Sequence, residues 1–255
     1  MTNLSQRLLA VAGCVTPGCA LLDVGCDHAF LTTYLLENGT VPCALCSDIN
    51  SGPLARAKEH IQSAHLENAA STELTGGIPR DYRKMLPALP HTGVSVVIAG
   101  MGGALMGRIL ADARDMLPDF TELVLSPQSE LATFRRTLTE LGLLIEEEKF
   151  LLDESKYYTV IRVVPTAGPI PEMTEEELHF GPCLIRERNP VLLAYLRRRK
   201  VILLAIEKEI RDHAGESAEE RLCELSEERK LVDAAITEMT GGNQRGDKVN
   251  ETHGS

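Results

Sequence analysis

The sequence predicts an α/β fold in which a doubly wound, mostly parallel sheet is followed by a helical C-terminal domain. Three observations lead to this prediction. Strand-like and helix-like patterns alternate over the first 165 residues, the last two strands of that series form a hairpin, and two long apolar stripes of helical period follow a proline-rich linker.

The elements of the first domain follow from hydrophobic period and turn residues, beginning with a short helix that ends near Gly13. Apolar runs bounded by turn residues predict strands near 20–24, 43–48, 70–74, 94–99, 121–126, 143–150 and 156–164. Amphipathic patterns predict helices near 29–37, 52–66, 79–86, 103–117 and 129–141. Such alternation is typical of a parallel sheet with helices on both faces.

The last two predicted strands are separated only by Asp153-Glu154-Ser155. This connection is too short for a crossover helix, so the two strands form a hairpin and one of them is antiparallel to the sheet. A parallel sheet that ends in a hairpin is the plan of the Rossmann-like class I methyltransferase fold.

A second domain follows the linker 165–171. Asn189 and Pro190 mark a helix start, because asparagine is a good N-cap and proline suits the first helical position. Two stripes then flank a break at 213–216 and predict an antiparallel helical hairpin or coiled coil. They consist of Leu192, Leu196, Arg199, Leu203, Ile206 and Ile210, and of Leu222, Leu225, Arg229, Val232, Ile236 and Met239. We therefore expect a sheet domain over 1–165, a helical domain over 172–240 and a disordered tail over 241–255.

Size and composition limit the class of protein. The 255 residues, 44% of them hydrophobic, suffice for a full core and a smaller second unit. The sequence shows no export signal and no run of about eighteen apolar residues, so we expect a cytoplasmic protein. The sequence does not determine the oligomeric state, and a monomer is only slightly favoured. Seven irregularly spaced cysteines indicate reduced thiols. Cys43 and Cys46 lie in a predicted strand and face opposite sides, so neither a disulfide nor a metal site is expected.

The net charge of −11 argues against a nucleic-acid partner, but the positive charges are clustered. The densest cluster is Arg197-Arg198-Arg199-Lys200, where Arg197, Arg198 and Lys200 flank the apolar seam and could meet phosphates. Charge alone equally allows a solvated helix face.

The most informative segment runs from Leu21 to Leu31 and is typical of a buried strand that ends in a glycine turn before a helix. Gly25 allows a tight turn beside a ligand, toward which the next helix directs its N-terminus. The following strand ends at Asp48, where a carboxylate can accept hydrogen bonds from both ribose hydroxyls.

This turn is not a dinucleotide fingerprint, because Asp27 and Phe30 occupy positions where that motif needs glycine. An acidic turn would repel a pyrophosphate but suits the cationic sulfur and ammonium of S-adenosylmethionine. Asp27 is expected to face the ligand. Asp23, on the strand, is expected to hold the turn by accepting backbone N–H bonds, and His28 either lines the pocket or caps its helix.

Two later segments belong to the same predicted edge of the sheet. Three glycines follow Ala99, at positions where cofactor and substrate could approach the backbone, although Gly103 could also serve helix packing. Ser126-Pro127-Gln128 ends the fifth strand, and its polar groups either read a base edge or cap the helix that begins near Glu130.

Taken together, these segments resemble the bacterial tRNA (adenine(22)-N1)-methyltransferase family over nearly all of residues 4–240. The motifs that carry the resemblance are Leu4-Ser5-Gln6-Arg7-Leu8, Asp23-Val24-Gly25-Cys26-Asp27-His28-Ala29-Phe30-Leu31, Ile98-Ala99-Gly100-Met101-Gly102-Gly103, Gly181-Pro182 and Asn189-Pro190-Val191. The resemblance implies S-adenosylmethionine as the methyl donor, tRNA as the substrate and a C-terminal domain that helps to hold tRNA.

The resemblance and the residue patterns together assign the site. Donor-binding residues are expected to be Asp23, Gly25, Cys26, His28, Asp48, Ile49, Gly76, Gly77, Ala99, Gly100 and Met101. Substrate-binding residues are expected to be Arg7, Phe30, Gly102, Ser126, Pro127, Gln128, Arg197, Arg198 and Lys200.

Three departures from the family pattern affect single contacts. Ser126-Pro127-Gln128 stands where the family usually has Gln-Pro-Asn, Gly76-Gly77-Ile78 where relatives have Gly-Asp-Gly, and Phe30 where a tyrosine is usual. The second departure removes the carboxylate expected to meet the adenine amine of the donor.

Methyl transfer to adenine N1 requires positioning rather than a covalent intermediate, and it requires an unpaired or flipped base. The ring gains positive charge, so Asp27 is the expected catalytic residue. Two alternatives remain open: an RNA adaptor that binds S-adenosylmethionine without catalysis, and a nucleotide-dependent oxidoreductase.

Overall fold

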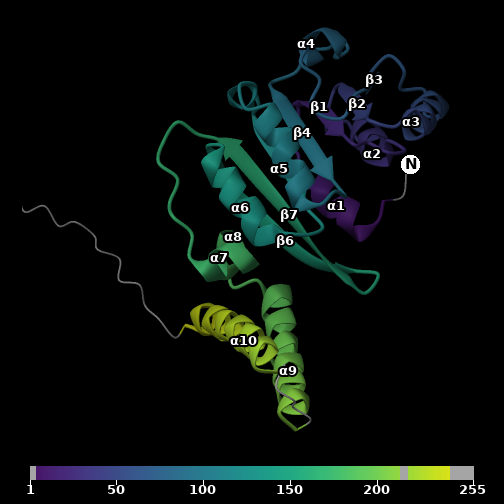
Figure 1. The fold of residues 1–255 in the computed structure, drawn as a ribbon. Coiled ribbons are helices and arrows are strands. Elements are labelled where there is room, and N and C mark those ends of the chain that lie inside the picture. Colours follow the sequence, from purple (N-terminus) through teal and green to yellow (C-terminus); the bar gives the residue numbers. More distant parts are fainter. Residues whose placement is uncertain (1–3, 213–217, 242–255) are drawn as a thin grey trace, which may run out of the picture. The chain divides into compact units, whose positions relative to one another are not determined.

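The computed structural model describes residues 4–212 and 218–241 (Figure 1). The chain forms two compact units, Met1–Leu184 and Ile185–Ser255.

The first unit contains a seven-stranded sheet with the order β3-β2-β1-β4-β5-β7-β6. Its strands are β1 (Ala20–Val24), β2 (Ala44–Asp48), β3 (Ala70–Leu74), β4 (Val94–Ala99), β5 (Glu122–Ser126), β6 (Leu143–Asp153) and β7 (Lys156–Pro165). β7 is antiparallel to both β5 and β6, while the neighbouring strands among β1 to β5 are parallel to one another. The predicted doubly wound sheet with one antiparallel hairpin strand is confirmed.

The helices of the sheet region cover both faces. They are α1 (Gln6–Ala12), α2 (Phe30–Glu37), α3 (Ser51–Ser63), α4 (Tyr82–Met85), α5 (Gly103–Asp112), the 3₁₀ turn η1 (Leu117–Asp119) and α6 (Leu131–Glu140). Leu22 and its strand neighbours pack with α5 and α6 in one apolar cluster. Leu21 and its neighbours pack with α1, α2 and α3 in another, because successive strand residues face opposite sides.

Two predicted helices are shorter in the structure. The helix expected over 79–86 is the single turn α4, which lies between Pro79 and Pro87. The residue before a proline is disfavoured in helical conformation, and this limits the turn. The helix expected over 103–117 ends at Asp112, and a separate 3₁₀ turn containing Pro118 follows.

The sheet unit extends to Leu184, so it includes α7 (Glu175–Phe180) and the first residues of α8 (Pro182–Arg186). A buried ion pair fastens them: Arg135 binds Glu148 at 2.9 Å and donates to the Leu178 carbonyl at 2.6 Å. Glu148 in turn accepts the Cys183 N–H at 3.0 Å.

The second unit contains α9 (Pro190–Asp212) and α10 (Ala218–Thr240), packed against each other as the expected helical pair. Asn189 caps α9 as predicted, accepting the N–H groups of Val191 and Leu192. Apolar side chains from both helices are buried, together with Glu207, which binds Arg229 at 2.8 Å. The break expected at 213–216 and the tail after Gly241 lie outside the described residues.

Candidate active site

Strand order reverses between β1 and β4, which lie side by side and run parallel. A crevice at such a reversal, beyond the carboxyl ends of the strands, is where α/β sheets bind ligands. The loops that follow β1, β2, β4 and β5 all reach this carboxyl edge, and they contain most of the predicted site residues.

The glycine turn after β1 meets the glycine loop after β4. Gly25 has φ +74°, and a Cβ placed there would lie 2.1 Å from the Met101 Cε. The N–H groups of Gly25 and Cys26 donate to the Ser47 carbonyl at 2.8 and 3.0 Å, which ties the turn to β2. Three neighbouring strands therefore fix the position of this turn.

The turn continues through two further left-handed residues, Asp27 at φ 49° and Ala29 at φ 56°. Residues other than glycine rarely adopt this conformation, and it clusters at functional sites. It leaves the Asp27 side chain 67% exposed, with its Oδ1 at 3.6 Å from the His28 Nε2 and 4.0 Å from the Arg56 Nη2. Asp27 is thus a solvent-facing carboxylate at the predicted edge.

Asp23 is buried beneath the turn. It accepts the Thr32 hydroxyl of α2 at 2.7 Å, which corrects the expectation that its partners are backbone N–H groups. Burial raises the pKa of Asp23 to about 6; the Thr32 hydrogen bond opposes this shift, and the nearby Asp48 charge adds to it. The hydroxyl satisfies the carboxylate because α2 begins directly after the turn and brings Thr32 over β1.

Cys26 helps to form the turn through its backbone N–H, and its thiol is not reactive. A hydrogen bond with the Cys46 thiol, together with burial, raises the pKa of Cys26, so the thiol stays protonated. The Cys46 thiol also donates to the Thr32 hydroxyl at 3.2 Å. All seven cysteines are free in the structure.

The loops after β2 and β3 form the other side of the edge. The Asp48 Oδ1 accepts the Asn50 N–H at 2.8 Å, which orients this carboxylate at the strand end. Ile49 is 71% exposed, and a Cβ at Gly76 would lie 3.0 Å from its Cδ1. Gly76 and Gly77 also line a cavity of about 280 Å³ that Arg80 borders.

The loops after β4 and β5 are joined by backbone hydrogen bonds. The Gly100 N–H donates to the Ser126 carbonyl at 3.2 Å, and the Gln128 N–H donates to the Met101 carbonyl at 2.9 Å. Gly100 has φ +88°, so it needs glycine for its conformation. Gly103 serves packing, since a Cβ there would lie 2.6 Å from the Ser129 carbonyl oxygen. Gly102 is also close to Ser129.

The segment Ser126-Pro127-Gln128 does not act as a unit. The buried Ser126 hydroxyl donates to the Thr159 carbonyl of β7 at 3.0 Å, and Pro127 is buried, whereas Gln128 is exposed. No side chain caps the N-terminus of α6, which begins after Glu130. Of the three residues, only Gln128 presents its side chain at the edge.

An aromatic group beside Asp27 includes residues that the sequence analysis missed. The His28 and Phe30 rings stack at 5.3 Å, and Phe30, 44% exposed, meets the His60 ring at 4.8 Å. His60 donates from Nδ1 to the His28 carbonyl at 3.0 Å, and Arg56 donates to the His28 Nε2 at 3.3 Å. The four-residue spacing of Arg56 and His60 on α3 places them on one helix face, and only the fold shows that this face meets the turn.

Arg7 reaches the same edge from α1. Its backbone N–H donates to the Asp153 Oδ2 at 3.0 Å, and its guanidinium lies 5.6 Å from the centre of the Tyr158 ring. The β6–β7 hairpin therefore positions this arginine.

The basic cluster of the second unit divides into two pairs. Arg199 binds Glu228 at 2.6 Å and Lys200 binds Asp233 at 2.7 Å, both across the helical pair. Arg197 and Arg198 are exposed on α9. Lys200 therefore has an ion-pair partner on α10, whereas the sequence analysis considered only a phosphate as its partner.

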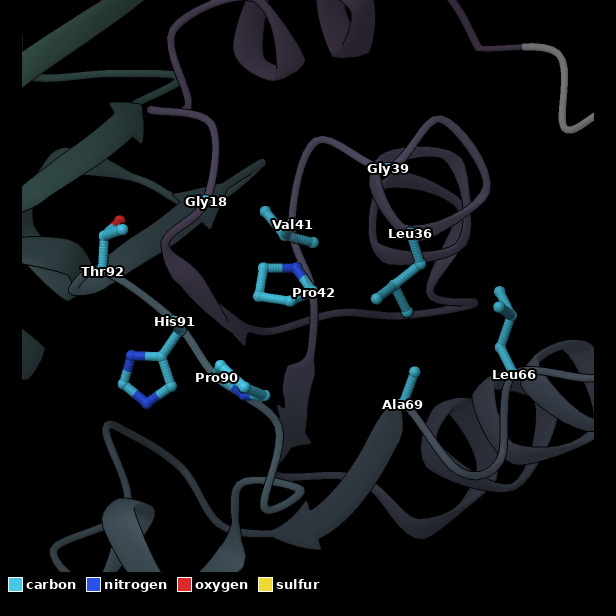
Figure 2. A pocket seen from close by; sticks show the side chains of 10 residues that line it. All are labelled: Gly18, Leu36, Gly39, Val41, Pro42, Leu66, Ala69, Pro90, His91 and Thr92. Atoms are coloured by element: carbon cyan, nitrogen blue, oxygen red, sulfur yellow. The ribbon is translucent and has the colours of Figure 1, made fainter.

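The cavity of about 540 Å³ in Figure 2 lies at the opposite, amino edge of the sheet. It is bordered by segments that lead into the strands, among them Gly18, Val41, Ala69 and Thr92, and by none of the predicted site residues. Among the described residues, no three His, Cys, Asp or Glu side chains are grouped to hold a metal ion. No helix in the described part of the chain is long and apolar enough to cross a membrane.

Comparisons with known proteins agree with this geometry. A family model described as tRNA (adenine(22)-N(1))-methyltransferase matches residues 21–233. The Bacillus subtilis tRNA (adenine(22)-N(1))-methyltransferase is 28% identical over 240 residues, which are 92% of this chain and 97% of the relative. The solved structure of the B. subtilis m1A22 tRNA methyltransferase has a TM-score of 0.73 at 25% identity, covering 92% of this chain and 100% of that one. A Streptococcus pneumoniae protein solved in complex with S-adenosyl-L-methionine has a TM-score of 0.76, with the same identity and coverage.

Proposed function

The chain belongs to the tRNA (adenine(22)-N(1))-methyltransferase family, and from this premise we propose that the carboxyl edge around the β1 turn is where donor and target base meet. The enzyme transfers a methyl group from S-adenosylmethionine to N1 of adenine 22 in tRNA. Membership of this methyltransferase family excludes the two alternatives left open by the sequence, the RNA adaptor and the oxidoreductase.

The residues at the edge suit S-adenosylmethionine chemically. Asp48, held at the end of β2, can accept hydrogen bonds from the ribose hydroxyls. Ile49 presents an exposed apolar side chain beside Gly76, and this apolar surface suits the flat adenine ring of the donor. It would contact the adenine where relatives use the aspartate of their Gly-Asp-Gly segment. Asp23 and the acidic turn supply negative charge near Gly25, where the ammonium and cationic sulfur would be favoured.

Asp27 is the residue we propose to act on the reacting base. When bound, the donor supplies a methyl group on a cationic sulfur. The S–C bond breaks and its electron pair stays on the sulfur, while the lone pair of N1 forms the new bond to the methyl carbon. N1 of neutral adenine carries no proton, so the protein need not provide a general base. The ring becomes cationic, and the exposed Asp27 carboxylate stabilises that charge at short range.

Arg56 and His28 keep Asp27 in place. Arg56 lies within 4.0 Å of the carboxylate and donates a hydrogen bond to the His28 ring. The backbone carbonyl of His28 accepts a hydrogen bond from His60. We assign Arg56 as a positioning residue, because it acts on the base only through Asp27 and His28.

The aromatic group offers a surface for the extruded base. N1 lies on the Watson–Crick edge, so adenine 22 must be unpaired or flipped before transfer. The exposed ring of Phe30, backed by the rings of His28 and His60, can stack on a nucleobase without a tyrosine hydroxyl.

The tRNA itself would be held in part by the second unit, through the exposed Arg197 and Arg198. Action as a monomer in the cytoplasm also belongs to this proposal.

The observation that carries the proposal is the meeting of the β1 and β4 glycine loops at Gly25 and Met101, with Asp27 exposed directly beyond. The test is methylation of unmodified tRNA, compared with the same tRNA carrying guanine at position 22. Nucleoside mapping should find 1-methyladenosine at position 22 of the first substrate and no product in the second. Methylation at another position would contradict the assigned target.

A further inference from the structure

The guanidinium of Arg7 contains a buried donor without an acceptor. Its Nη1 is shielded from solvent and has no hydrogen-bond partner among the described residues. Buried polar groups in folded proteins are nearly always paired, so an unpaired arginine nitrogen at the edge of an active site indicates that a ligand supplies the acceptor.

The fold holds this donor in place by several contacts. Ser5 caps α1 by accepting the Leu8 N–H at 3.3 Å, and Asp153 accepts the Arg7 N–H at 3.0 Å. Tyr158 lies under the guanidinium, with its ring centre 5.6 Å away. Helix α1 and the β6–β7 hairpin together fix where the side chain points.

The side chain points to Gly100. A Cβ built on Gly100 would lie 3.7 Å from the Arg7 Nη1 and 3.8 Å from the amide nitrogen of Gln128. Two polar side chains therefore approach one point at the carboxyl end of β4, where the lack of a side chain on Gly100 leaves room. Gln128 is exposed and available to a ligand.

A negatively charged acceptor suits the Arg7 guanidinium better than the target base does. Adenine becomes cationic as N1 is methylated, so an arginine at its edge would oppose the reaction. A guanidinium prefers a carboxylate or a phosphate, whose oxygens match its planar array of donors.

We infer that Arg7 and Gln128 form an oxyanion-binding site over Gly100 for one of the two substrates. This inference rests on the proposed function. The oxyanion has two possible sources: a phosphate of the tRNA beside the target nucleotide, or the carboxylate of the donor's methionine part. The chemistry is shared, and two measurements distinguish the sources.

The first measurement is the dissociation constant of S-adenosylmethionine without tRNA, for the wild type, Arg7→Ala and Arg7→Lys. Arg114→Ala serves as the matched control, because Arg114 is an exposed arginine that bonds the Glu140 carbonyl. If the carboxylate is the ligand, Arg7→Ala should weaken donor binding at least about tenfold, and a decarboxylated donor should bind wild type and variant equally.

The second measurement is the KM for tRNA at saturating donor. If a phosphate is the ligand, Arg7→Ala should raise this KM at least about tenfold with donor affinity unchanged, and Arg7→Lys should restore only part of it. A neutral methylphosphonate next to nucleotide 22 should then weaken wild-type binding but not that of Arg7→Ala.

Retained 1-methyladenosine at position 22 in the variant would show that the proposed function holds independently of Arg7. Unchanged donor affinity and unchanged KM in a folded Arg7→Ala protein would overturn the oxyanion site.

Discussion

Asp23 shows how its surroundings move a single carboxylate away from its ordinary titration. Burial raises its pKa to about 6, although the Thr32 hydroxyl stabilises the ionised form. Since the pKa is higher in the folded than in the unfolded chain, ionising Asp23 costs the free protein stability as the pH rises toward 6. A cationic ligand nearby would relieve this cost.

We therefore predict that donor binding weakens as the pH falls below about 6, by up to about tenfold per pH unit, because a protonated Asp23 no longer attracts the cationic donor. Calorimetric titration between pH 5 and 7.5 measures this. Thr32→Val should move the midpoint upward, and Asp23→Asn should remove the dependence. A wild-type dissociation constant that is flat across this range would contradict the role of Asp23.

At the residue scale, the sequence was informative where backbone conformation determines residue type. Gly25 is predicted from a tight turn and Gly100 from the close approach of a ligand to the backbone, and both have positive φ. The type of Ser126 suits either base recognition or helix capping, yet its hydroxyl bonds the carbonyl of Thr159, on a strand far along the chain. The partners of Asp27, and the pair Arg56 and His60, likewise depend on tertiary packing that the local sequence does not encode.

At the scale of elements, the segment Gly181-Pro182 connects two short helices over a buried ion pair. Gly181 has φ +102°, and a Cβ there would lie within 2.8 Å of all three atoms of the Glu148 carboxyl group. That carboxylate binds Arg135 and the Cys183 N–H, so it cannot move without breaking both contacts. This explains why glycine is required at this motif.

Gly181→Ala should lower the free energy of unfolding by roughly 2–4 kcal/mol, from the strained φ together with displacement of the buried carboxylate. Gly39→Ala is the matched control, because Gly39 also has a positive φ (+65°) but no atom within 4 Å of the added Cβ. Thermal and urea unfolding should show a smaller loss for Gly39→Ala, about 1 kcal/mol. Equal losses in the two variants would show that the Glu148 contact contributes nothing.

The strands were the elements best predicted from sequence, because apolar runs between turn residues leave little choice of conformation. Helix ends were predicted less well where prolines shorten them, as at α4. The packing of α7 onto the sheet could not be predicted, since it depends on Arg135 meeting Glu148 and the carbonyl of Leu178.

At the scale of the whole molecule, a chain with net charge −11 must bind a polyanion through a local excess of positive charge. In the second unit, Arg197 and Arg198 are exposed, whereas Lys200 is bound to Asp233. We therefore expect the first two residues of the cluster to contribute more to phosphate binding than Lys200 does.

The double variant Arg197→Ala, Arg198→Ala should weaken tRNA binding and reduce the log–log salt slope by about two, one for each lost phosphate contact. Lys200→Ala should change the slope by less than about half a unit. Filter binding over a series of salt concentrations measures both. Identical slopes for the double variant and the wild type would show that these arginines only form a solvated face.

We propose that Asp27 stabilises the adenine as it becomes cationic, at the edge where the β1 and β4 loops meet. The most direct test is the single-turnover methylation rate of Asp27→Asn, measured beside its dissociation constant for S-adenosylmethionine. We predict that the rate falls at least about tenfold while donor affinity changes less than about threefold, because the charge is needed mainly in the transition state. A full methylation rate in the folded variant would contradict the claim.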